Sequence, residues 1–254
     1  MNTSFTANLN QIEGDLDAKS EVGLVLPTFC EASNIEKLIS DIESLNLDVR
    51  ILVIDDSSPD GTADTVRRLQ EKYKNILLLV RPNKSGLGTA ITDGFKTLIS
   101  MKNPPNYIVT MDADYSHNPK EVPRAILTAK EGKGLAIGSR YCRGGQVLNW
   151  SVFRRLTSRI ANILAYFLVR AKIHDYTSGL RCYSTRLVRE MVPDLHSQTY
   201  EIQIETIRQA RKRGFDVREF PMTFINRKSG KSKLSANEIK EFTSHIFKIK
   251  RLKG

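Results

Sequence analysis

Two aspartates separated by one residue, Asp112 and Asp114, are the residues of this chain with the clearest potential for chemistry. They follow the apolar, β-rich run 107–111 and precede a segment of turn-forming residues, 116–119. In a strand, residues i and i+2 share a face, so both carboxylates can converge on one cation. Carboxylate oxygens suit a hard divalent ion such as Mg2+ or Mn2+, which can also bridge phosphates. The alternative is a solvated acidic turn that caps the next helix.

The elements that would position these carboxylates alternate between strand and helix over the first 140 residues. Apolar runs predict buried strands at 22–26, 51–54, 76–80, 107–111 and 135–138. Apolar residues at helical spacing predict helices at about 35–45, 62–73 and 90–98. Pro27 is expected to end the first strand, and Asn34 is the expected N-cap of the first helix. This pattern predicts an α/β protein whose parallel sheet is covered on both faces.

After residue 140 the pattern changes to mainly helices. The expected elements are a helix at 150–170, a loop at 174–182, helices near 185–192 and 201–213, a strand near 217–225 and a basic helix at 235–250. Residues 1–20 are polar without periodicity, which predicts a flexible N-terminal extension. Residues 21–254 are predicted to form a single domain, with a nucleotide half at about 21–140 and an acceptor half at about 141–254.

The chain of 254 residues carries a net charge of +11, which fits partners that carry phosphates: nucleotides, nucleic acid or an anionic membrane surface. Three widely spaced cysteines fit a reducing cytosol and support neither a disulfide framework nor a zinc site.

No signal-peptide pattern is present, and no apolar run reaches the roughly 18 to 20 residues that span a bilayer. The longest run, 160–169, is flanked by arginines and predicts a buried helix, preferred over an interfacial one. We therefore expect a cytoplasmic protein that is at most peripheral to a membrane.

Further acidic residues follow two more of the predicted strands. Glu31 follows the first strand, and Asp55 and Asp56 end the second. An aspartate in that position can accept hydrogen bonds from a nucleobase or a ribose hydroxyl. The same pair is expected to start an Asx-turn through residues 57–61, which does not exclude binding.

Glycines and basic residues supply possible phosphate contacts, each with a structural alternative. Gly86 and Gly88 form at most a fragment of a phosphate-binding loop, and complete dinucleotide and P-loop motifs are absent. Arg140, after the fifth strand, can pair with carboxylates or bind a phosphate. The loop 175–181 combines an acid, hydroxyls and an arginine, or is an ordinary capped turn. The basic loop 227–234 can close over a pyrophosphate, or is a solvated stretch or a nucleic-acid contact.

The order of these motifs resembles that of the GT-A glycosyltransferases of family 2. The resemblance rests on the segments 27–31, 55–62, 112–117, 138–141, 177–181 and 227–234. It covers roughly residues 21–245, and within the family it is similar to the enzymes that act on polyprenyl phosphates. It implies a GT-A nucleotide-diphospho-sugar transferase fold with a mostly parallel central sheet flanked by helices.

The resemblance implies an enzyme that transfers mannose from GDP-mannose to polyprenyl (dolichyl) phosphate with inversion. It implies dependence on Mg2+ or Mn2+. The basic C-terminal tail and the apolar stretch 160–169 are expected to bring the enzyme into peripheral contact with the cytosolic, anionic face of a membrane. A phosphate acceptor is already anionic, so no strong general base is required. The alternative donors are UDP-glucose and UDP-GlcNAc. A basic nucleic-acid-binding module is a distant alternative, because the strand-end carboxylates would repel phosphates.

The resemblance also assigns roles to individual residues. The implied nucleotide-sugar-binding residues are Pro27, Phe29, Glu31, Val53, Asp55, Asp112, Ala113, Asp114, Ser116, Arg140, Arg227 and Lys233. The implied catalytic residues are Asp112, Asp114, Arg140 and Arg159. The implied metal ligands are Asp112, Asp114 and Ser116. Arg159 is implied to meet the lipid phosphate. Phe29 stands where the family usually has Tyr and keeps a stacking surface, whereas Ser116 replaces a Gln of some members and is a weaker metal ligand.

Overall fold

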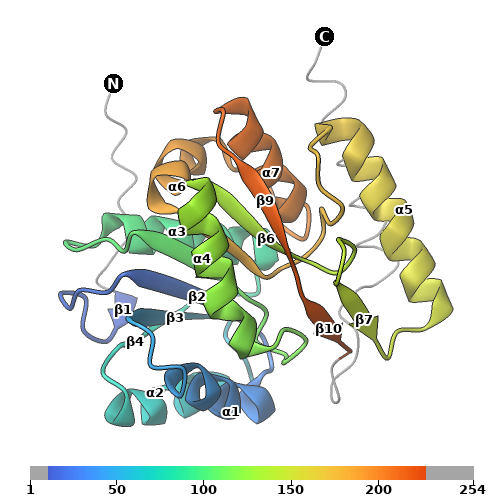
Figure 1. Ribbon diagram of the computed structural model, residues 1–254. Helices are drawn as coiled ribbons and strands as arrows, with labels where there is room; N and C mark the ends of the chain where they lie inside the picture. The colour runs from blue at the N-terminus through green and yellow to red at the C-terminus, as the bar shows by residue number, and fades with distance from the viewer. Residues whose placement is uncertain (1–10, 227–254) are drawn as a thin grey trace.

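A mixed, mostly parallel sheet forms the centre of the protein, which the computed structural model describes over residues 11–226 (Figure 1). Its eight strands follow the order β1-β4-β3-β2-β5-β8-β6-β9. Their bounds are β1 Ile12–Glu13, β2 Val22–Thr28, β3 Val49–Asp55, β4 Ile76–Val80, β5 Tyr107–Thr110, β6 Leu135–Ser139, β8 Arg181–Ser184 and β9 Val217–Pro221. β2 to β5 are parallel, and β8 runs antiparallel between β5 and β6. A second sheet pairs β7 (Gln146–Leu148) with β10 (Thr223–Ile225).

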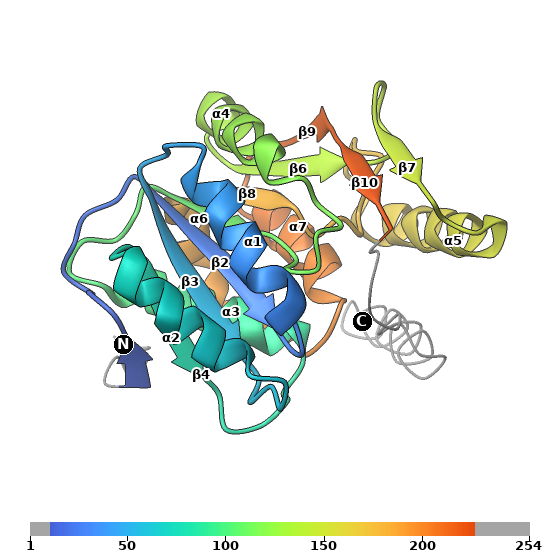
Figure 2. The ribbon, with the colours of Figure 1, turned by 90° about the horizontal axis from the view of Figure 1, so that it is seen from below.

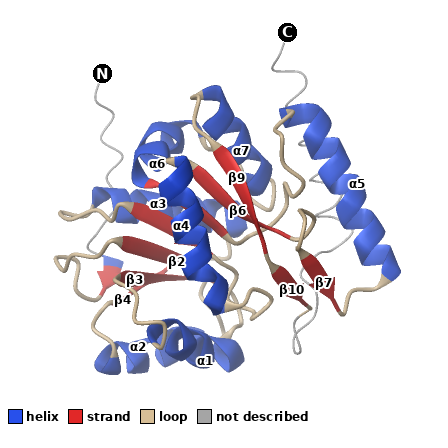
Figure 3. Cartoon of the chain, viewed as in Figure 1, coloured by secondary structure: helices blue, strands red, loops and turns tan. Residues whose placement is uncertain are grey.

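Helices cover both faces of the central sheet (Figure 3). They are α1 Ala32–Glu43, α2 Thr62–Lys72, α3 Leu87–Ser100, α4 Val122–Gly132, α5 Val152–Val169, α6 Thr185–Met191 and α7 Ile202–Lys212, with 3-10 turns η2 Pro119–Glu121 and η3 Val192–Asp194. Side chains that alternate along a strand contribute to the hydrophobic cores on opposite faces of the sheet. Leu24 and Leu26 belong to the core shared with α1, α2 and α4, and Val25 to the core shared with α3, α6 and α7. The predicted α/β sheet, buried on both faces, is confirmed.

Two predicted boundaries are wrong for local reasons. β2 continues through Pro27 to Thr28. Its pairing with β5 ends at Val25, so no strand on the β5 side requires a hydrogen bond from residue 27, where proline has no N–H. α1 begins at Ala32, so Asn34 is not its N-cap. Instead, the Asn34 side-chain amide donates to Glu31 Oε2 at 2.9 Å, inside the first turn.

Two short strands had no clear sequence pattern, and one predicted strand is divided. β8 begins within the predicted loop 174–182, and its first residue, Arg181, interrupts any apolar run although it is fully buried. β7 has only three residues. The predicted strand 217–225 is divided into β9 and β10, which belong to different sheets. In each case long-range pairing, rather than local periodicity, decides the structure.

Part of the predicted N-terminal extension is attached to the central sheet. Ile12 in β1 pairs antiparallel with Leu79 of β4, and the Glu13 carboxylate accepts hydrogen bonds from Arg67 at 2.8 and 2.9 Å. Residues 1–10 lie outside the described part of the chain, as do the predicted basic loop 227–234 and basic helix 235–250.

The helix α5 differs from the buried helix that was preferred from the sequence. It lies at the edge of the molecule, beyond the β7–β10 sheet (Figure 2). Only Asn162, Ala165 and Val169 are buried along it. The opposite face exposes large apolar side chains, among them Phe153 at 76% and Phe167 at 66%. Among the helices of residues 11–226, none has the length and apolarity needed to cross a bilayer.

Candidate active site

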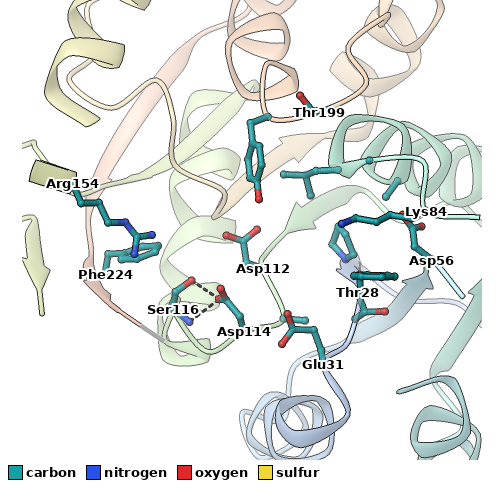
Figure 4. A pocket seen from close by; sticks show the side chains of 17 residues that line it. Thr28, Glu31, Asp56, Lys84, Asp112, Asp114, Ser116, Arg154, Thr199 and Phe224 are labelled. Carbon is teal, nitrogen blue, oxygen red and sulfur yellow. Dashed lines mark hydrogen bonds between the residues drawn. The ribbon is translucent and has the colours of Figure 1, made fainter. Parts of the chain in front are cut away.

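A pocket opens where β2, β3 and β5 end (Figure 4). These strands are parallel neighbours, so the acidic residues that follow them meet at one edge of the sheet, as predicted. The pocket is lined by Pro27, Thr28, Phe29, Glu31, Asp56, Lys84, Gly86, Leu87, Ala90, Asp112, Ala113, Asp114, Ser116, Arg154, Thr199, Tyr200 and Phe224. The structure thus brings Pro27, Phe29 and Glu31 together with the segment 112–116.

Asp112 and Asp114 both reach the pocket, and their surroundings fix their orientation. Asp114 Oδ1 accepts hydrogen bonds from the backbone N–H of Ser116 at 3.0 Å and from its hydroxyl at 2.5 Å. A Cβ on Gly179 would lie only 3.0 Å from either oxygen of Asp112, so the glycine leaves room for that carboxylate. The loop 175–181 therefore supports the site from behind.

The donor set fits a divalent cation that is shared with a substrate. Within the described ranges, no group of three or more His, Cys, Asp or Glu side chains forms a metal site by itself. Mg2+ commonly binds through one or two carboxylates and completes its shell with water and substrate phosphates, which suits Asp112 and Asp114. Ser116 supports Asp114 through its hydroxyl, and its role as a direct ligand stays a prediction.

His117 is a buried neighbour of this site that the sequence did not single out. Its ring lies edge-on to Phe224, and Nδ1 is 3.7 Å from Asp112 Oδ2. Burial lowers the pKa of His117 to about 4, so the imidazole is neutral near pH 7. Its backbone bridges to Phe224 of β10, which ties the loop after β5 to the second sheet.

The end of the pocket near β2 suits a nucleoside. Phe29 offers an aromatic face, and Lys84 Nζ lies 4.4 Å from the centroid of its ring. Glu31 supplies a carboxylate to the same end (Figure 4). Asp56 also lines the pocket, although it is held by Arg81 Nε at 2.6 Å. A base can stack on the aromatic face while carboxylates accept its N–H groups.

Two predicted nucleotide contacts do not line the pocket. Val53 is fully buried in the core under α1 and α2. Asp55 is also fully buried, and its oxygens accept from Thr28 Oγ1 at 2.9 Å and from the backbone N–H of Ser58 at 2.8 Å. Asp55 thus forms the predicted Asx-turn, and its neighbour Asp56 is the residue that reaches the pocket. The strand alternation of side chains separates the two.

Arg140, a predicted catalytic residue, lies outside the pocket lining because it is paired elsewhere. Its Nε and Nη2 each donate to Asp175 at 2.7 Å, and both residues are buried. Burial acts to lower the pKa of Arg140, but the adjacent carboxylate outweighs it and the pKa is raised. Of the two alternatives for this arginine, the structure shows a carboxylate pair, and the carboxylate comes from the loop 175–181.

Arg159 is exposed on α5 and does not line the pocket, whereas Arg154 of the same helix does. The Arg154 guanidinium lies 4.3 Å from the centroid of Trp150, and its Nη1 donates to Asn226 Oδ1 at 2.7 Å. The predicted phosphate contacts Arg227 and Lys233 lie outside the described residues.

Other pocket residues escaped the sequence analysis. Lys84, Thr199, Tyr200 and Phe224 stand in segments without a chemical motif.

The family model for glycosyl transferase family 2 matches residues 24–192. A polyprenol monophosphomannose synthase of Mycolicibacterium smegmatis is 36% identical over 220 residues, which cover 86% of this chain and 82% of the relative. A dolichol-phosphate mannosyltransferase of Pyrococcus furiosus is 33% identical over 238 residues, 92% of this chain but only 65% of the relative.

Solved structures share the fold at low identity. Glucosyl-3-phosphoglycerate synthase from Mycobacterium tuberculosis, in complex with Mn2+, UDP-glucose and phosphoglyceric acid, has a TM-score of 0.65 at 17% identity and covers 92% of this chain and 79% of its own. A mannosyltransferase from Pyrobaculum calidifontis, in complex with GDP-Man and Mn2+, has a TM-score of 0.57 at 16% identity, with 87% and 60% covered.

The mostly parallel sheet with an acidic strand-end pocket defines a GT-A fold, as predicted. The chain belongs to glycosyl transferase family 2, and it is a glycosyltransferase.

Proposed function

We propose that this enzyme transfers mannose from GDP-mannose to the phosphate of a polyprenol, with a divalent cation and at a membrane surface. The observation that carries the proposal is the layout of the pocket. In Figure 4, Asp112 and Asp114 lie between Arg154 on one side and Thr28 and Lys84, at the proposed nucleoside end, on the other. The names of the two relatives support mannose as the sugar and a polyprenyl phosphate as the acceptor.

The proposed reaction is a single displacement with inversion. An oxygen of the acceptor phosphate forms a bond to the anomeric carbon, while the bond from that carbon to the β-phosphate oxygen of GDP-mannose breaks. The electron pair leaves with GDP, so charge and atoms balance without a general base. Asp112 and Asp114 would hold Mg2+ or Mn2+, which when bound neutralises charge on the departing diphosphate. Arg154 would orient the acceptor phosphate for in-line attack.

The donor is tested by thermal denaturation with Mn2+ and either GDP or UDP. We expect GDP to stabilise the protein by about 2.7 kcal/mol at a hundredfold excess over its dissociation constant, and UDP to have a smaller effect. Transfer of labelled mannose into a polyprenyl phosphate, lost on addition of EDTA, checks the reaction itself. Stabilisation by UDP alone would favour the UDP-sugar alternative. Steeply salt-dependent binding of oligonucleotides without any nucleotide effect would favour the nucleic-acid module.

The helix α5 is the part that we propose meets the membrane. Its exposed apolar residues are Val152, Phe153, Leu156, Ile160, Ile163, Leu164, Tyr166 and Phe167. Exposed Arg155, Arg159 and Arg170 border this face and suit anionic head groups. Because α5 also carries Arg154 into the pocket, a lipid head group at this helix lies next to the proposed acceptor site.

A matched pair of leucines tests the membrane contact. Leu156 on α5 and Leu127 on α4 are both 57% exposed. We expect Leu156→Asp to weaken binding to vesicles of phosphatidylcholine and phosphatidylglycerol by about tenfold or more, because burial of a leucine is worth about 1.5–3 kcal/mol. Leu127→Asp should leave binding unchanged. Sedimentation with vesicles measures both, and equal effects of the two variants would exclude α5 as the docking surface.

A further inference from the structure

The loop of residues 196–200, between η3 and α7, forms a wall of the pocket that no predicted motif covers. It contributes Thr199 and Tyr200 to the lining. Figure 4 shows Thr199 and Glu31 on opposite sides of the Asp112 carboxylate. The loop therefore borders the proposed cation site on the side away from Glu31.

Two carboxylates at the start of α7 hold this loop. Glu201 accepts the backbone N–H groups of Gln198 at 3.0 Å and Thr199 at 3.1 Å, and also the Thr199 hydroxyl. Glu205 accepts the backbone N–H of Ser197 at 2.9 Å. Although burial acts to raise the pKa of Glu201, these hydrogen bonds outweigh it and the pKa is lowered. The wall is thus built into the fold before any ligand binds.

Gly86 and Gly88 allow the loop to pack tightly against the start of α3. The Gly88 N–H donates to the Gln198 carbonyl at 2.8 Å. A Cβ on Gly88 would lie 2.4 Å from the Ser197 carbonyl oxygen, and one on Gly86 would lie 2.5 Å from that of Gln198. These glycines therefore admit a protein loop, and a backbone carbonyl already occupies the start of the helix where a phosphate would bind.

The chemistry of the pocket distinguishes what this wall can bind. Four of the lining residues carry neutral hydroxyls, namely Thr28, Ser116, Thr199 and Tyr200. The first lies in the β2 end of the pocket, and the second donates to Asp114 beside the cation site. The other two lie on the 196–200 loop. Neutral hydroxyls suit the hydroxyls of a sugar, whereas an acceptor phosphate needs a cation such as Arg154.

We propose that the 196–200 loop recognises the transferred sugar and that Tyr200 is a specificity-determining residue. This inference rests on the proposed function, because the sugar must extend from the diphosphate at Asp112 and Asp114. The Tyr200 phenol supplies one hydrogen-bonding group and an aromatic face, and the Thr199 oxygen can accept a hydrogen bond while its proton is donated to Glu201.

Calorimetric binding of GDP and of GDP-mannose, each with Mn2+, tests this assignment with Tyr200→Phe. We expect the variant to bind GDP-mannose about threefold to tenfold more weakly and to bind GDP within about twofold of wild type, because one hydrogen bond to the sugar is lost. Tyr107→Phe, at the opposite end of β5 from Asp112, is the matched control and should change neither affinity.

Other results would separate an error in the role of Tyr200 from an error in the proposed donor. An equal loss for both ligands would make Tyr200 a nucleotide contact, and no change for either ligand would also overturn the assignment. If the wild type binds UDP and UDP-glucose instead, the proposed donor is wrong, and the same comparison between those two ligands tests Tyr200. In transfer assays, we expect the ratio of kcat/KM for GDP-mannose to that for GDP-glucose to be smaller in Tyr200→Phe than in wild type.

Discussion

Replacing Asp114 with asparagine is expected to lower kcat/KM for sugar transfer by about 10³-fold or more, since the loss of a cation ligand removes several kcal/mol of charge stabilisation. The fold should persist. Asp114 Oδ1 accepts two hydrogen bonds from Ser116, and an asparagine oxygen can accept both. The substitution therefore removes the charge and keeps the turn, which separates a chemical role from a structural one.

Steady-state kinetics over a range of Mn2+ concentrations, together with thermal denaturation, measure this effect. A weakened site should recover part of its activity when Mn2+ is raised. Asp64→Asn is the control, because Asp64 is an exposed acid on α2 that pairs with Arg67. Wild-type turnover by Asp114→Asn at ordinary metal concentration would show that this carboxylate does not hold the cation.

The acidic edge was predictable because each of its parts has a local pattern. An unbroken apolar run followed by an acid indicates a buried strand with a carboxylate at its end, and the parallel sheet brings such ends together. This reasoning placed Glu31, Asp112 and Asp114 in one pocket. It did not distinguish Asp55 from Asp56: Asp55 is fully buried, whereas Asp56, one residue further along, lines the pocket.

The opposite side of the pocket was not predictable, because its residues are brought together only by the tertiary fold. Arg154, Tyr200 and Phe224 come from a helix, a loop and a short strand that no common pattern links. The role of Gly86 and Gly88 was not predictable either. Two glycines at the start of a helix indicate that another group approaches the backbone closely, but they do not identify that group. Here the approaching group is the backbone of the 196–200 loop.

The buried pair of Arg140 and Asp175 gives the second large expected effect, on stability. Asp175→Ala should lower the free energy of unfolding by about 3–5 kcal/mol, because it leaves a buried guanidinium without its counter-charge. Arg140 is 7% exposed and Asp175 is fully buried, so solvent cannot replace either partner. Asp175 also accepts the backbone N–H groups of Arg140 at 3.0 Å and Thr177 at 3.1 Å, which adds to the loss.

The same pair sets a dependence on pH. Burial acts to raise the pKa of Asp175, but the charge and hydrogen bonds of Arg140 outweigh it, and the pKa is lowered. A carboxyl whose pKa is lower in the folded state stabilises the protein above its unfolded pKa of about 3.9. That contribution is lost as the pH falls through the folded-state pKa. The difference in stability between wild type and Asp175→Ala should therefore shrink below about pH 4.

Urea denaturation of Arg140→Ala, Asp175→Ala and the double variant at pH 7 measures the coupling. The double variant should be less destabilised than the sum of the single ones, because it leaves neither charge buried alone. Arg186 forms an ion pair with Glu190, and its side chain is 82% exposed. Arg186→Ala should therefore lower the free energy of unfolding by less than about 1 kcal/mol. Arg140→Ala tests the predicted phosphate contact as well. A loss of transfer with unchanged stability would place this arginine at a substrate phosphate, whereas unfolding at lower urea identifies it as the support of the loop 175–181 behind Asp112.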